Sequence, residues 1–94
     1  MLYNFFVSGT GAAGVAKNIV DRILKEFKVI EEVTRLTQNL TTKLKVIYRS
    51  FDGDFSWADL GGAIFDIGQL IITFLPGKKL VDVISVLWDI ATIL

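Results

Sequence analysis

Hydrophobic residues between positions 15 and 50 recur at intervals of three and four, which is the spacing of one face of an α-helix. The recurring residues are Ile19, Ile23, Phe27, Ile30, Val33, Leu36, Leu40, Leu44 and Ile47. No proline or glycine interrupts this segment. The pattern predicts one long amphipathic helix over residues 15–50, about 50 Å in length. The threonine-rich stretch, residues 34–42, has the lowest helix propensity, so we expect any bend or break to occur there.

Two strongly apolar segments follow, and each carries a narrow row of polar side chains. They span residues 56–75 and 78–94 and are separated by Pro76-Gly77. Proline ends a helix, and only a tight turn lies between the segments. We therefore expect two antiparallel helices that form an apolar hairpin over residues 56–94.

The polar positions of the hairpin are spaced by three, four or seven residues, which places each row on one face of its helix. When residues are counted outward from the turn along each helix, the polar positions of the two rows match, and Asp66 is expected beside Asp89. Buried carboxylates in so apolar a setting are costly without a polar partner, so we expect the two rows to face each other, or jointly to face a third element, in a polar seam with the apolar faces turned outward. The residues of this seam are Asp59, Asp66, Gln69, Thr73, Asp82, Ser85 and Asp89.

Charge is divided unevenly along the chain, although the net charge is zero. Residues 1–50 hold eight basic and four acidic side chains, whereas residues 51–94 hold two basic and six acidic ones. We expect the basic side chains to pair with the acidic half, within or between chains, or to contact lipid headgroups. Nucleic-acid binding is not expected, because acidic residues interrupt the basic ones. The basic residues assigned to pairing are Lys25, Lys28, Arg35, Lys78 and Lys79.

The composition limits what the chain can do. It has 94 residues, of which 52% are hydrophobic, and a mean hydropathy of +0.54. One small domain, 1–94, has little interior, so we expect lipid or neighbouring copies to cover part of its apolar surface. Histidine and cysteine are both absent, which excludes disulfides, a Ser-His-Asp triad and histidine zinc sites. We expect no enzyme activity, no cofactor and no metal site.

One short motif resembles a nucleotide-binding fingerprint. Residues 9–14 read G-x-G-x-x-G, follow an apolar run over residues 2–7, and precede a helical pattern. In Rossmann folds this motif joins a strand to a helix within a larger parallel sheet. The rest of the chain shows no further strands. We therefore interpret residues 1–14 as a Gly-broken apolar segment that allows helices or subunits to approach closely.

Residues 51–56 form the expected linker between the long helix and the hairpin. Asp52, Asp54 and Ser56 match the opening of a calcium-binding loop, but Trp57 and Ala63 replace its glycine and its closing glutamate. A turn in which Asp54 or Ser56 caps the next helix fits the sequence better.

Together these patterns predict an all-α fold, with a long amphipathic helix followed by an antiparallel C-terminal helical hairpin. Two apolar helices joined by a basic turn are similar in layout to conjugative pilins and small virion membrane proteins. We expect a structural subunit of a homo-oligomeric assembly, in a membrane or a membrane-containing particle or filament, that binds copies of itself, lipid and other subunits. Two alternatives stay open: a pore-forming, holin-like protein, and a soluble helical bundle that binds a partner, as immunity-type proteins do.

Overall fold

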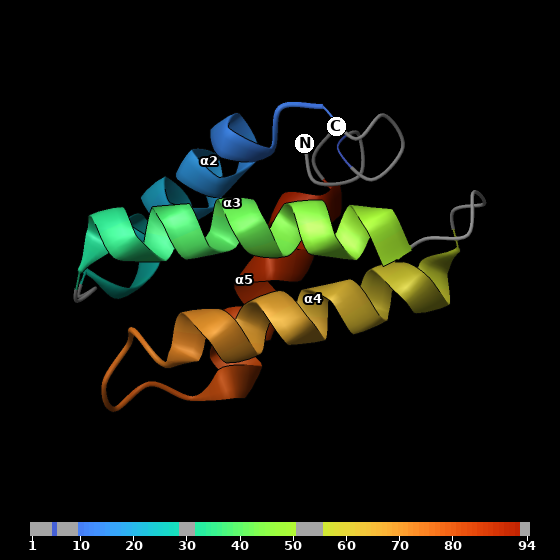
Figure 1. Cartoon of the computed structure of the whole chain (residues 1–94). Coiled ribbons are helices and arrows are strands. Elements are labelled where there is room, and N and C mark those ends of the chain that lie inside the picture. The colour runs from blue at the N-terminus through green and yellow to red at the C-terminus, as the bar shows by residue number, and fades with distance from the viewer. Residues whose placement is uncertain (1–4, 6–9, 29–31, 51–55, 93–94) are drawn as a thin grey trace.

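The structure is a computed structural model that describes residues 5, 10–28, 32–50 and 56–92. The described residues contain four α-helices and no strand, which confirms the all-α prediction. The helices are α2 (Ala12–Phe27), α3 (Val33–Ser50), α4 (Trp57–Ile72) and α5 (Leu80–Thr92). In Figure 1, α3 and α4 lie side by side and run in nearly opposite directions, α5 crosses behind them, and α2 lies above α3 and passes behind one end of it.

The chain forms two helices where the periodicity predicts one, and the break lies outside the threonine-rich stretch. α2 ends at Phe27, and Lys28 adopts a left-handed conformation, φ 61°, in which its N–H donates to the Leu24 carbonyl at 2.8 Å. Glu32 is also left-handed, with φ 53°, immediately before α3. α3 packs extensively against α2. The prediction of one helix over residues 15–50 is therefore wrong.

Packing rather than local propensity decides where this break occurs. A single long helix would leave its apolar stripe uncovered, whereas folding it back buries the stripe from both sides. Ile19, Ile23, Leu36 and Leu40 all have 0% exposure. Burying one such side chain contributes about 1.5–3 kcal/mol. A left-handed non-glycine residue costs about 1–2 kcal/mol, so the burial outweighs the strain.

The threonine-rich stretch is helical although its propensity is low, because its apolar residues Leu36 and Leu40 are buried in the core. The Thr37 hydroxyl donates to the Val33 carbonyl, and the Thr41 hydroxyl donates to the Thr37 carbonyl, each at 2.9 Å. Both bonds reach one turn back along the helix, which is a common arrangement for threonine inside helices.

α4 and α5 pack against each other and are joined by a turn at Pro76-Gly77. The Ser56 hydroxyl accepts a hydrogen bond from the Asp59 N–H at 3.1 Å, so Ser56 caps α4 as the sequence indicated. Gly77 has φ 79°, a left-handed conformation that glycine adopts without a steric penalty.

The contact between α4 and α5 is apolar and depends on a small residue. A Cβ atom placed on Gly68 would lie 3.1 Å from Cγ1 of Ile84 and 3.4 Å from Cδ1 of Leu80. A Cβ on Gly61 would lie 3.8 Å from Cζ2 of Trp88. Glycine at position 68 therefore lets α5 approach the backbone of α4 closely.

All four helices contribute to one hydrophobic core. Ile19 of α2, Leu40 of α3, Ile64 of α4 and Leu87 of α5 each have 0% exposure. α2 packs most extensively on α3, and α4 on α5, with smaller contacts between α3 and α4 and between α2 and α5. The fold is thus two helix pairs packed together. Its radius of gyration of 12.2 Å is close to the value of about 12 Å expected of a compact chain of this length.

Most of the expected Gly-broken segment, residues 1–14, and all of linker residues 51–55 lie outside the described residues. Gly11 precedes α2 with φ 79°. A Cβ at Gly11 or Gly14 would meet nothing within 4 Å, so close packing inside this chain does not require glycine at either position.

Candidate functional site

The polar rows of α4 and α5 lie on the outer surface of the chain rather than between its helices. No polar or charged side chain is buried among the described residues. The apolar faces form the core instead. This is the reverse of the prediction, which placed the polar rows inside and the apolar faces outside. Burying the apolar faces leaves the carboxylates in water, so their desolvation cost is avoided. The exposed residues of the two rows are Asp59, Asp66, Gln69, Thr73, Asp82, Ser85 and Asp89.

The structure does not place Asp66 opposite Asp89. Trp88 lies against the position of Gly61, and Leu80, Ile84 and Leu87 lie around that of Gly68. Counting from the Gly68–Ile84 contact places Asp89 level with residue 63, and counting from the Gly61–Trp88 contact places it level with residue 60, so Asp66 lies about three to six residues further along α4. The two polar rows do not meet between the helices, because all seven residues are exposed and the contact around Gly68 is apolar.

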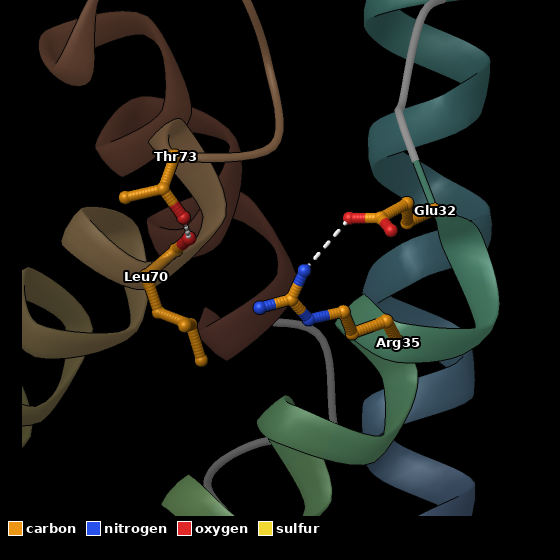
Figure 2. A network of polar contacts seen from close by, with 4 residues as sticks. All are labelled: Glu32, Arg35, Leu70 and Thr73. Atoms are coloured by element: carbon orange, nitrogen blue, oxygen red, sulfur yellow. Dashed lines mark hydrogen bonds and ion pairs between the residues drawn. The ribbon is translucent and has the colours of Figure 1, made fainter.

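Arg35 joins the first helix pair to the second. Its Nη1 donates to Oε2 of Glu32 at 3.0 Å, and its guanidinium carbon lies 5.9 Å from the centroid of the Phe74 ring. Figure 2 shows this side chain extending from α3 toward the end of α4, where the Thr73 hydroxyl donates to the Leu70 carbonyl at 2.6 Å. Arg35, one of the basic residues singled out in the sequence, thus pairs within its own chain.

The other basic residues singled out in the sequence are exposed at helix ends. Lys25 lies in the last turn of α2 and Lys28 at its C-cap, where a positive charge interacts favourably with the helix dipole. Lys78 and Lys79 precede α5. None of the four forms an ion pair with another described residue.

The exposed face of α3 carries basic and neutral side chains and no acidic one. We call this face the basic strip, and it is a feature that the sequence reasoning missed. The signal was present, since residues 33–50 contain four basic residues and no Asp or Glu. The basic strip consists of Arg35, Gln38, Thr42, Lys45, Val46 and Arg49.

The exposed face of the neighbouring helix α4 has the opposite character. We call it the acidic strip, and it contains no basic residue: Asp59, Gly62, Phe65, Asp66, Gln69 and Thr73. Described ion pairs, Arg22–Glu26 at 3.3 Å and Arg35–Glu32 at 3.0 Å, both lie in the first half of the chain. Lys45, Arg49, Asp59 and Asp66 form no ion pair with a described residue. Two strips of opposite charge therefore lie side by side.

A shallow hollow between α2 and α3 is the candidate small-molecule site. It has a volume of about 300 Å³ and is lined by Lys17 and Asp21 of α2 and by Val33, Thr37 and Gln38 of α3, among others. These side chains include no nucleophile paired with a base. The part of the chain that the structure describes also holds no group of three or more acidic side chains able to bind a metal ion.

Two further observations concern the chain as a whole. Among the helices described, none is both long enough and apolar enough to cross a membrane. Comparisons with protein-family models, with curated proteins and with solved structures each give no match.

Proposed function

We propose that this chain is a non-catalytic structural subunit that associates with copies of itself through its charged surface. The observation that carries the proposal is the basic strip of α3 beside the acidic strip of α4. Each strip offers charges that the chain itself leaves without an ion-pair partner among the described residues. A second copy brings the complementary strip.

Complementary strips favour association because each charge finds an opposite charge on the other copy. A single exposed ion pair contributes only about 0–1 kcal/mol, so several pairs and some apolar contact are needed. The strips supply the apolar part as well, since Val46 is 53% exposed and Phe65 is 45% exposed. We therefore expect a specific association that weakens as salt is added.

This proposal changes the mechanism of assembly expected from the sequence. The sequence indicated that outward apolar faces bind lipid or neighbouring copies. Those faces form the core, and the charged faces are the ones available to a partner. Location in a membrane or in a membrane-containing particle stays a prediction from composition, and the proposed association does not depend on it.

Sedimentation velocity tests the proposal. At about 0.01 M salt the Debye length is about 30 Å, and at about 1 M it is about 3 Å. We expect species heavier than the 10.5 kDa chain at low salt, and a shift toward the single chain at high salt. A 10.5 kDa species at every salt and protein concentration would contradict the proposal.

A helical bundle that binds a different protein is the second candidate. The observation in its favour is the core, which is closed within one chain and contains no buried polar side chain among the described residues. Such a bundle stays monomeric by itself at all salt concentrations. The same sedimentation experiment therefore separates the two candidates.

A further inference from the structure

We infer that the chain forms a closed two-fold dimer in which α3 of each copy lies against α4 of the other. This inference rests on the proposed self-association and specifies its surfaces, its partner and its copy number. The partner is a second copy of this chain. The basic strip and the acidic strip lie on the same face of the molecule, on the neighbouring helices α3 and α4.

The strips lie on one face because α3 and α4 are neighbours in the same layer. Figure 1 shows the two helices side by side and nearly antiparallel, with α5 behind them. The contact of Arg35 with Phe74 provides a reference point for their relative height. Counting forward along α3 and back along α4 from this contact places Arg49 level with Leu60, one residue from Asp59.

Three outward-facing residues on each strip follow the same spacing. Thr42, Lys45 and Arg49 are separated by three and four residues on α3, and Asp59, Gly62 and Asp66 are separated in the same way on α4. All six are exposed, so each triplet lies along the outward face of its helix. Because the helices are antiparallel, Arg49 is near the height of Asp59, and Thr42 is near that of Asp66.

Consider a two-fold axis that runs between α3 and α4, parallel to both helices. Rotation about this axis leaves the position of each residue along the helix direction unchanged and places α3 of one copy over α4 of the other. Arg49 then faces Asp59 of the second copy, and Lys45 lies within reach of Asp66 of that copy. Symmetry repeats both pairs, so the contact is isologous and closes at two copies.

At the centre of this contact the two surfaces are complementary in shape as well as in charge. Val46 is 53% exposed on the basic strip. Counted from the Arg35–Phe74 contact, its height is that of residue 63, next to Gly62. Gly62 is exposed, and a Cβ atom there would meet nothing within 4 Å, so its backbone is open to an approaching side chain. An apolar side chain opposite an uncovered glycine allows the two helices to approach closely.

Charge reversal on each strip tests this arrangement. One variant carries Lys45→Glu with Arg49→Glu, and the other carries Asp59→Lys with Asp66→Lys. Each variant alone repels its own copies, so we expect 10.5 kDa particles by sedimentation velocity. An equal mixture pairs the reversed basic strip with the reversed acidic strip, and we expect it to restore a particle of twice that mass. A chain that carries all four substitutions should dimerise by itself.

The controls distinguish surface effects from unfolding. Circular dichroism at 222 nm, the usual helix band, should be unchanged in each variant. Lys17→Glu with Lys25→Glu makes the same change in charge on the exposed face of α2, and we expect this variant to retain the dimer.

Each failure has its own meaning. If the wild-type chain associates and the mixture stays at 10.5 kDa, the dimer inferred here is wrong, whereas the proposed self-association stands. If the mass grows beyond two copies as protein is added, the contact is open rather than closed, which overturns the two-fold arrangement. A wild-type chain that never associates overturns both.

Discussion

The guanidinium carbon of Arg35 on α3 lies 5.9 Å from the ring centroid of Phe74, which follows α4. Arg35 also pairs with Glu32, the left-handed residue at the start of α3. One side chain thus connects the reversal between α2 and α3 with the end of α4 (Figure 2). The contact links the first helix pair, through α3, with the residues that follow α4.

Replacing Arg35 by alanine should lower the free energy of unfolding by about 0.5–1 kcal/mol, because an exposed cation–π contact is lost. The exposed ion pair with Glu32 adds little. Arg22→Ala is the matched control, since it removes an exposed ion pair with Glu26 on α2. Urea unfolding compares the two variants. Equal losses at positions 22 and 35 would argue against a contribution from Phe74.

Lys28→Gly should stabilise the chain, because Lys28 is left-handed with φ 61°. Glycine removes a cost of about 1–2 kcal/mol and adds about 0.4–1 kcal/mol of unfolded-state entropy, so a small net gain follows. If residues 15–50 instead formed one continuous helix, the same change would destabilise it by about 1 kcal/mol. The sign measured by urea unfolding therefore decides whether the break lies at Lys28.

Gly68→Ala should destabilise the chain, because its Cβ would lie 3.1 Å from Cγ1 of Ile84. Overpacking of this kind costs about 1–3 kcal/mol, which outweighs the gain of up to about 1 kcal/mol from replacing glycine by alanine inside a helix. Gly14→Ala is the control, since position 14 lies within α2 and its Cβ would meet nothing within 4 Å. Alanine there should raise stability by up to about 1 kcal/mol through helix propensity. Thermal unfolding of both variants should show shifts of opposite sign.

Leu40→Ala should cost about 2–5 kcal/mol, because it leaves a cavity in the core. Leu40 is 0% exposed, whereas Val46 on the same helix is 53% exposed. Val46→Ala should therefore change the stability of the single chain by less than about 0.5 kcal/mol. Similar losses at the two positions would mean that the exposed face of α3 is buried in the folded chain.

Features that depend on nearest neighbours along the chain could be predicted from the sequence. The apolar periodicity predicted the helical fold class. Nearly all of the recurring apolar residues in α2 and α3 lie in the core or pack against it, including Ile19, Leu36 and Leu44. Ser56 caps α4, and a turn follows at Pro76. Each of these features follows from spacing or from the chemistry of one residue.

Features that depend on packing between distant segments could not be predicted in this way. The break at Lys28 has no glycine or proline to mark it and results from folding α2 onto α3. The close approach of α4 and α5 at Gly68 is not revealed by the polar rows. The outward direction of the polar rows follows once α2 and α3 cover the apolar faces. The charge bias of residues 33–50 was present in the sequence, but the acidic residues of α2 concealed it while residues 15–50 were read as one helix.

The mass of the equal mixture of the two charge-reversed variants tests the central claim most directly. Neither variant has a complementary strip on its own copies, so the wild-type contact can form only between the two kinds of chain. We expect a particle of twice 10.5 kDa in the mixture and 10.5 kDa in each separate sample. A mixture that remains at 10.5 kDa would contradict the claim.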